Sequence, residues 1–187
     1  YFRSRIMFPW RNYFKELLAF QGRRFPDYLE ITKFSNTKDT RFFTKGKILW
    51  GLDKTKKYII ENKSLILVEG QMDLVQLYEN GIKNVAAIGG TSFTPYHATI
   101  VKNLSENIFI LMDGDKAGKE AAIKHGYLLF SKGVEAKIII PPDSLDPDDW
   151  IKRDKASVVL STLEKSKNVV DTHYEIFMEK SSGSILE

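Results

Sequence analysis

The sequence predicts an α/β fold, in which a mainly parallel four-stranded sheet is flanked by helices and preceded by a small basic part of mixed α+β structure. Two observations lead to this prediction. After residue 64, short apolar runs alternate with helical patterns, which is typical of parallel strands joined by crossover helices. The charge also divides there: residues 1–64 hold 15 Lys and Arg against 6 Asp and Glu, whereas residues 65–187 hold 13 against 18.

The first part of the chain is aromatic, basic and irregular. Two short strands are predicted at residues 6–8 and 17–20, joined by a long loop. Residues 22–46 are predicted to form a loop, because proline, asparagine and glycine interrupt any regular pattern. A short helix is predicted at residues 52–62.

Four apolar runs predict the strands of the main sheet, at residues 65–68, 85–88, 108–112 and 136–140. Continuous apolar runs of this kind are typical of strands covered on both faces. Helical patterns follow at residues 72–78, 95–104 and 116–131, and two more helices are expected after residue 149. We therefore predict three parts: a basic subdomain (1–64), an α/β domain (65–148) and C-terminal helices that pack on the core (149–187).

The composition excludes several kinds of site within these residues. There is no cysteine, which excludes disulfides, thiol nucleophiles, zinc ribbons and iron–sulfur clusters. No apolar run approaches the ~20 residues that cross a bilayer, so no membrane association is expected. The three histidines, His97, His125 and His173, share no spacing that indicates a metal site and are interpreted as surface or packing residues.

Carboxylates follow three of the four predicted strands. Glu69 follows the first, Asp113 and Asp115 follow the third, and Asp143, Asp146 and Asp148 come after the fourth. In an open α/β sheet, ligands bind beyond the carboxyl ends of the strands, so we expect these side chains to share one edge. Asp73 lies one helical turn after Glu69 and is expected to face the same crevice.

Carboxylates gathered in this way raise one another's pKa, and a bound cation offsets that cost. Mg²⁺ favours a few carboxylates together with water and substrate phosphates. Alternatives stay open at this point. An isolated Asp-Gly-Asp such as Asp113–Asp115 is usually a turn, and Asp146 could serve only to cap the next helix. Response-regulator-like domains also gather acids at strand ends.

Three motifs resemble the Toprim domain, the metal-binding module shared by bacterial primases, topoisomerases and some nucleases. They are Glu69-Gly70-Gln71-Met72-Asp73, Asp113-Gly114-Asp115 and Asp146-Pro147-Asp148. Further stretches resemble the bacterial DNA primase catalytic core in particular, over about residues 3–155. These are Arg5-Ile6-Met7-Phe8-Pro9-Trp10-Arg11, Gly22-Arg23, Lys33-Phe34-Ser35-Asn36, Phe43-Thr44-Lys45-Gly46, Leu49-Trp50-Gly51-Leu52, Asn80-Gly81-Ile82-Lys83-Asn84 and Gly90-Thr91-Ser92-Phe93-Thr94.

The sequence departs from the family pattern at Gln71, where Tyr is usual, at Gln21, where Gly is usual, and over residues 24–32, which align poorly. The acidic motifs are intact. The resemblance implies that Glu69, Asp113 and Asp115 are catalytic and bind metal, that Asp146 and Asp148 complete a second metal site, and that Asp73 is a further candidate ligand. Glu69 could instead act as a general base. The implied cofactor is Mg²⁺ or Mn²⁺, in two or more ions, with no zinc in these residues.

The basic part supplies the candidates for nucleic-acid and nucleotide binding, because cationic and amide side chains contact phosphates. The resemblance points to Arg5, Arg11, Arg23, Lys33, Asn36 and Lys45. Aromatic residues interleave with them at Phe34, Phe42, Phe43 and Trp50, and bases can stack on such rings. Trp50 is expected to lie in the core instead.

The resemblance implies a DNA primase core that makes short RNA primers on a DNA template by metal-dependent nucleotidyl transfer. The implied partners are single-stranded DNA, ribonucleoside triphosphates, the RNA–DNA hybrid product and a replicative helicase, which binds through a domain outside these residues. The implied location is cytoplasmic, at the replication fork of the bacterial nucleoid. Two alternatives remain: another Toprim enzyme, such as a nuclease or a topoisomerase, or a non-catalytic nucleic-acid-binding module.

Overall fold

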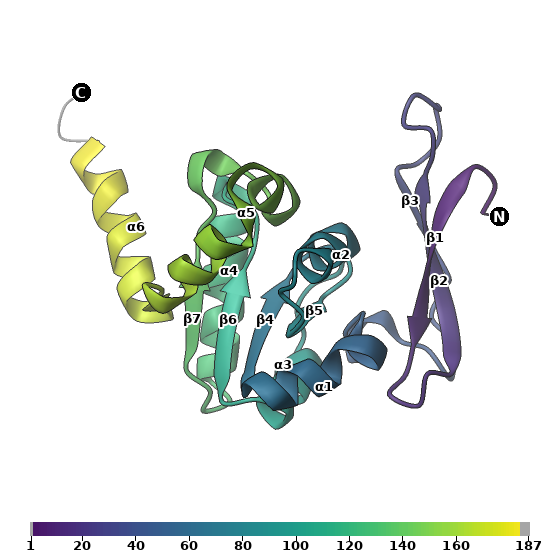
Figure 1. The fold of residues 1–187 in the computed structure, drawn as a ribbon, viewed down its shortest axis with the longest axis horizontal. Coiled ribbons are helices and arrows are strands. Elements are labelled where there is room, and N and C mark those ends of the chain that lie inside the picture. The colour runs from purple at the N-terminus through teal and green to yellow at the C-terminus, as the bar shows by residue number, and fades with distance from the viewer. Residues whose placement is uncertain (1, 184–187) are drawn as a thin grey trace.

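The computed structural model describes residues 2–183 and contains two separate β-sheets (Figure 1). A three-stranded antiparallel sheet is formed by β1 (Arg5–Arg11), β2 (Leu17–Arg24) and β3 (Phe34–Asn36). A five-stranded sheet has the strand order β5-β4-β6-β7-β8. In Figure 1 the antiparallel sheet stands to one side of the larger sheet, next to α1, α2 and β5.

The larger sheet confirms the predicted α/β fold. Its strands β4 (Ser64–Val68), β5 (Val85–Ala87), β6 (Asn107–Leu111) and β7 (Ala136–Ile139) are parallel, with β4 and β6 at the centre. A fifth strand, β8 (Lys167–Asn168), pairs antiparallel with β7. It was not predicted, because its two polar residues carry no strand pattern and it depends on β7 for pairing.

The antiparallel sheet contains another unpredicted strand. β3 lies within residues 22–46, which the sequence predicted to be a loop, and that part of the prediction is wrong. Gln21 pairs with Asn36 and Arg23 pairs with Phe34 across the ladder. The three residues of β3 are too few to show a period, so the edge of β2, and not local propensity, determines its structure.

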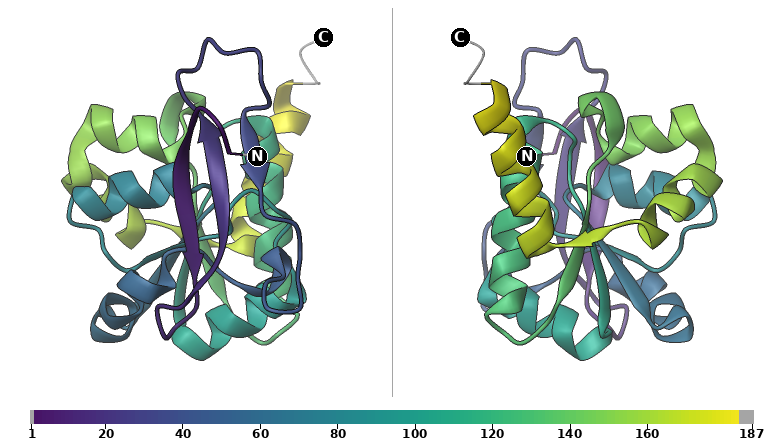
Figure 2. Two further views of the ribbon diagram at one scale, coloured as in Figure 1. Left: turned by 90° about the vertical axis from the view of Figure 1, so that its right-hand side faces the viewer. Right: turned by 90° about the vertical axis from the view of Figure 1, so that its left-hand side faces the viewer.

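Within the described residues, six α-helices surround the larger sheet. They are α1 (Leu52–Asn62), α2 (Gln71–Glu79), α3 (Pro95–Leu104), α4 (Lys116–Phe130), α5 (Pro147–Glu164) and α6 (Val169–Gly183), with short 3₁₀ turns η1 (Lys45–Lys47) and η2 (Pro142–Ser144). Alternate residues of β4 face opposite layers: Leu65 and Leu67 pack with α1, α3 and α4, while Ile66 and Val68 pack with α2 and α5. Figure 2 shows α2 and α5 on one side of the sheet and α4 and α6 on the other.

The two sheets are joined by packing and by hydrogen bonds. The ring of Trp10, which is 1% exposed, covers Gly89 so closely that a Cβ there would lie 2.5 Å from the indole. Trp50, which was expected in the core, is partly buried between two apolar clusters, and its indole N–H donates to the Pro9 carbonyl (2.9 Å). The ring of His97 is fully buried, and its Nε2 contacts the carbonyl of Ile48 at 3.0 Å. The basic sheet is therefore fixed against the α/β layer.

No helix among residues 2–183 is both long enough and apolar enough to cross a membrane.

Candidate active site

The carboxyl edge of the larger sheet brings the predicted acids together. Glu69 directly follows β4 and is exposed. Asp73 lies in the first turn of α2 and is 8% exposed; its Oδ2 accepts a hydrogen bond from the Gly70 N–H (2.8 Å). This contact closes the turn between β4 and α2 and orients Asp73 toward the sheet edge.

Asp113 follows β6 after the buried Met112, and its position is fixed by two glycines. The Gly114 N–H donates to the Leu145 carbonyl (2.7 Å), and a Cβ on Gly114 would lie 2.6 Å from the Pro141 carbonyl oxygen. A Cβ on Gly118 would lie 2.1 Å from the Asp113 carbonyl oxygen. The loop that carries Asp113 is thus held against the segment that precedes Asp146.

Asp115 and Asp146 each cap a helix. Asp115 Oδ1 accepts from the Gly118 N–H at the start of α4, and Asp146 Oδ1 accepts from the Asp149 N–H at the start of α5, both at 2.7 Å. Each cap uses one carboxylate oxygen, and each carboxylate lies at the positive end of a helix dipole. Capping therefore anchors these two side chains without preventing the other oxygen from binding a cation.

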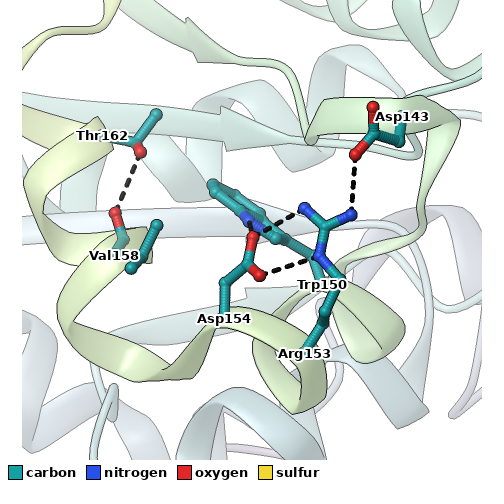
Figure 3. A network of polar contacts seen from close by, with 6 residues as sticks. All are labelled: Asp143, Trp150, Arg153, Asp154, Val158 and Thr162. Carbon is teal, nitrogen blue, oxygen red and sulfur yellow. Dashed lines mark hydrogen bonds and ion pairs between the residues drawn. The ribbon is translucent and has the colours of Figure 1, made fainter.

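The segment between β7 and α5 is braced by an ionic network (Figure 3). Arg153 of α5 pairs with Asp143 (2.7 Å) and with Asp154 (2.7 Å), and the indole N–H of Trp150 donates to Asp154 (3.1 Å). Asp148 pairs with Lys152 one turn further along α5 (2.7 Å). Asp143 and Asp148 therefore already have cationic partners, whereas no cationic side chain lies within ion-pair distance of Asp146 among the described residues.

Burial and repulsion raise two carboxyl pKa values at this edge. Burial raises the pKa of Asp73 to about 7, with smaller contributions from the charges of Asp113, Asp146 and Asp148. Burial also raises the pKa of Asp113 to about 6, and neighbouring carboxylates add to the shift.

The neighbours that raise the pKa of Asp113 come from different strand ends: they are Glu69, Asp146 and Asp115. The carboxylates therefore lie within electrostatic range of one another across the crevice. Lys33 of the basic part lowers the same pKa, so its ammonium group also lies within electrostatic range of Asp113.

The donor set fits a hard divalent cation, because all of its side-chain ligands are carboxylates and their mutual repulsion favours a neutralising charge. Within residues 2–183, no three acidic or histidine side chains converge closely enough to enclose an ion. An ion at this edge would therefore be held by few protein oxygens, completed by water and by ligand phosphates. Mg²⁺ commonly binds in this way.

The structure places the predicted basic residues in two groups. Lys45 Nζ donates to Asn36 Oδ1 (3.1 Å) and to the Gly90 carbonyl (3.4 Å), and the neighbouring Gly89 N–H donates to the Glu69 carbonyl (2.8 Å). Lys45 and Asn36, like Lys33, thus lie on the side of the basic sheet that faces the acids. Burial lowers the pKa of Lys45.

The other predicted basic residues make mainly local contacts. The Arg5 guanidinium donates to the carbonyls of Gly22 (3.2 Å) and Lys33 (3.3 Å), which braces the strands, and Arg23 pairs with Asp27 (3.3 Å). Arg11 lies at the opposite end of β1 and donates to the Lys15 carbonyl (2.7 Å). The aromatic residues also divide: Phe34 and Phe42 are exposed, whereas Phe43 is 3% exposed and packs on Trp10.

Sequence reasoning missed three features of the site. Gly118 could have been predicted as the partner of Asp115, because a side chain that caps a helix accepts a hydrogen bond from the backbone N–H two or three residues later. Gln21 and Gln71, noted only as departures from a family pattern, are both more than nine-tenths buried at the joint between the sheets. The pairing of Lys152 with Asp148 had the i, i+4 spacing of a helical ion pair.

Comparison with known proteins agrees with this geometry. Residues 66–151 match the family model described as Toprim-like, and residues 1–56 match the N-terminal domain of the DNA primase catalytic core. The chain belongs to the family of DNA primase catalytic cores. The two matches follow one another along the chain, as the resemblance predicted, and the Toprim fold is confirmed.

Individual relatives cover nearly the whole chain. A DNA primase of Staphylococcus epidermidis is 34% identical over 96% of this chain. The Aquifex aeolicus primase structure, with its zinc-binding and RNA polymerase domains, is 34% identical with a TM-score of 0.87, over 97% of this chain and 45% of that one. The structure of a DnaG primase catalytic domain bound to single-stranded DNA is 28% identical with a TM-score of 0.85, over 96% of this chain and 57% of that one.

The chain spans 31% of the length of the Staphylococcus epidermidis relative, and 29% and 33% of the length of two Staphylococcus aureus primases that it also matches.

Proposed function

We propose that this chain carries the polymerising site of a DNA primase, which makes short RNA primers on a DNA template by nucleotidyl transfer. The observation that supports this most is the set of carboxylates from three strand ends at one edge, next to a basic sheet, in a chain of the primase family. Membership of that family favours primer synthesis over the two alternatives, another Toprim activity and a non-catalytic binding module.

Glu69, Asp113 and Asp115 are proposed to hold the divalent ions, which are Mg²⁺ or Mn²⁺ and number two or more. Asp146 and Asp148 complete the acidic crevice, and Asp73 supports it from α2. When bound, such ions would lower the pKa of the attacking 3′-hydroxyl and neutralise charge on the reacting phosphates. Glu69 is exposed, so the alternative role of general base also stays open to it.

The remaining residues are proposed to position the nucleic acid and the nucleotide. Lys33 and Lys45 present ammonium groups beside the acids, where phosphates of a template or an incoming nucleotide would meet them. Asn36 holds the Lys45 ammonium. Arg5 and Arg23 already make contacts within the basic sheet, so we assign them to supporting the surface and to outer phosphate contacts.

The wider assignments follow from the same proposal. The partners are a single-stranded DNA template, ribonucleoside triphosphates, the RNA–DNA hybrid and a replicative helicase that contacts another part of the protein. The location is the bacterial cytoplasm at the replication fork. The division into a basic subdomain (1–64), a Toprim domain (65–148) and C-terminal helices (149–187) is likewise a proposal.

The test is synthesis of labelled RNA on a single-stranded DNA template with ribonucleoside triphosphates and Mg²⁺ or Mn²⁺. We expect RNA primers from the wild-type chain and at least a ~100-fold loss in Asp113→Asn, since misplacing a reacting group by about 1 Å already costs this much. Glu135→Gln is the control, because it removes the same charge from the opposite edge, just before β7. Cleaved DNA without RNA, or full synthesis by Asp113→Asn, would overturn the proposal.

A further inference from the structure

A cluster of cations that form no close ion pair with a described carboxylate lies around α1 and the start of β5. We call it the α1 basic patch; it consists of Arg11, Lys15, Lys54, Lys56, Lys57 and Lys83. Among residues 2–183, none of these six side chains lies within 4.0 Å of a carboxylate. On α5 and after it, Lys152, Arg153 and Lys167 are ion-paired, whereas Lys155 and Lys165 have no ion pair with a described carboxylate.

Tyrosine rings lie among these cations and join them into one surface. The distances from ammonium nitrogen to ring centroid are 4.8 Å for Lys56 on Tyr13, 4.5 Å for Lys57 on Tyr58, and 5.3 and 5.5 Å for Lys83 on Tyr58 and Tyr78. Tyr13 is 48% exposed, and the rings of Tyr58 and Tyr78 are partly exposed. The patch therefore offers both charge and aromatic faces.

The patch surrounds a groove. Arg11, Lys15, Lys54 and Lys57 line a hollow of about 690 Å³ together with Tyr78, and Asp53 is its one carboxylate. A second hollow of about 300 Å³ shares Arg11, Asp53, Lys54 and Tyr78 and is lined further by Trp50 and Glu79. The three surface elements involved are the turn between β1 and β2, the helix α1 and the end of α2.

This groove is separate from the acidic crevice. Lys83 precedes β5, and Lys57 and Lys83 both lie over the ring of Tyr58, so this part of the patch lies where β5 starts. The first turn of α1 lies nearer the other end of β5, because Trp50 pairs with Ala87. Neither hollow is lined by Glu69, Asp113 or Asp146. The acids follow the carboxyl ends of the strands, and the five residues of β4 separate the two edges of the sheet by ~17 Å. In Figure 1, α1 lies near the start of β4, away from its arrowhead.

We propose that the α1 basic patch binds single-stranded DNA, at a second contact remote from the acids. Unpaired clustered cations repel one another, and a phosphate backbone relieves this repulsion while releasing counterions. Exposed aromatic rings between cations accept stacked bases, which suits an unpaired strand better than a duplex. Phosphate contacts and stacking on aromatic rings carry little information on base identity, so binding there does not depend on sequence.

The inference rests on the proposed function, which makes a single strand the template. β1 runs from the Lys33 side of the basic sheet to Arg11, a length of seven residues or ~23 Å. A long template could therefore contact the carboxyl edge and the patch together, along the antiparallel sheet. A short oligonucleotide held at the acids would not reach the patch.

The test compares Lys54→Glu/Lys57→Glu with the charge-matched control Lys132→Glu/Lys165→Glu, by fluorescence anisotropy of a labelled 30-nucleotide oligo-dT across a salt series. We expect the patch variant to bind at least ~10-fold more weakly, with a salt slope reduced by about 1.4, because each lost phosphate contact removes about 0.7. Lys54→Arg/Lys57→Arg should bind normally. Melting curves of all variants serve as the folding control.

Three outcomes would overturn the inference: equal binding by the patch variant and its control, a duplex that competes as well as oligo-dT, or patch-dependent binding to anionic vesicles in place of DNA. Each can be distinguished from failure of the proposed function, since Asp113→Asn should bind the oligonucleotide normally while losing primer synthesis. If the patch variant binds normally and Asp113→Asn is inactive, only this inference fails.

Discussion

Asp113 is held by two glycines that leave no room for a side chain. Gly114 faces the backbone of the segment that carries Asp146, and Gly118 faces the backbone of Asp113 itself. Backbone atoms cannot move aside as a flexible side chain can. The position of the central carboxylate therefore depends on residues that take no part in the chemistry.

Replacing Gly114 by alanine tests this dependence. The new Cβ would lie 2.6 Å from the Pro141 carbonyl oxygen and 3.0 Å from that of Leu145, so the two acidic loops must separate. We expect the substitution to lower the free energy of unfolding by about 1–3 kcal/mol, as overpacking does. Primer synthesis should fall by more than the fraction of folded protein falls. Gly81→Ala is the control, because nothing lies within 4 Å there and its cost is confined to a positive φ of 91°. Wild-type synthesis by Gly114→Ala at a temperature where it is folded would contradict the account.

At the level of single residues, the positions of the carboxylates were predictable from the sequence. The residues that hold them in place were only partly predictable. An apolar run followed by a carboxylate marks a strand end, which is why Glu69 and Asp113 could be placed from the sequence. The partners of a side chain depend on loops that meet only in the fold. The hydrogen bond from Gly114 to Leu145 joins residues 31 positions apart, and no local pattern indicates it.

Two helices begin at carboxylates of the crevice, so each of these side chains can both cap a helix and face a cation. Asp115 caps α4 and Asp146 caps α5, so the carboxylates that would face a cation also satisfy the first N–H groups of a helix. The capping alternative for Asp146 is thus seen in the structure, but it does not exclude metal binding. The two roles can be separated by choice of substitution.

Asp146→Asn and Asp146→Ala should differ in stability and agree in activity. Asparagine caps a helix about as well as aspartate, whereas alanine loses about 0.5–2 kcal/mol. Both remove the charge, so both should synthesise primers weakly at low metal concentration and recover in part as Mn²⁺ is raised. Thermal melting and a metal titration measure the two effects. If Asp146→Asn is fully active at every metal concentration while Asp146→Ala is not, the residue serves only as a cap.

At the level of elements, long apolar runs were predicted well and short polar strands were not. The four parallel strands are buried on both faces, so their composition alone marks them. β3 and β8 have three and two residues and form because a neighbouring strand offers an open edge. These two strands form because they pair with β2 and β7, and the residues of a short segment do not show which distant strand it will pair with.

Across the whole molecule, the uneven charge is arranged in space as well as along the chain. Lys33 lies within electrostatic range of Asp113 at the Arg5 end of β1, and Arg11 lies with the lysines of α1 at the other end. Lys45 lies over the ring of Trp10 and donates to the Gly90 carbonyl. The sequence showed the excess of cations in residues 1–64 but not this division. It depends on β1 running the length of the sheet, so that residues six positions apart lie at opposite ends.

The central claim is that carboxylates from separate strand ends act as one cation site, and direct measurement of Mn²⁺ binding tests it. The electron paramagnetic resonance signal of free Mn²⁺ should fall as the wild-type chain is added and should recover when Mg²⁺ competes. We expect Glu69→Gln and Asp113→Asn each to weaken Mn²⁺ binding by at least ~10-fold, or about 1.4 kcal/mol, because each removes a charged oxygen ligand from the same ion. Glu135→Gln should bind as the wild type does. Wild-type Mn²⁺ affinity in both Glu69→Gln and Asp113→Asn would contradict the account.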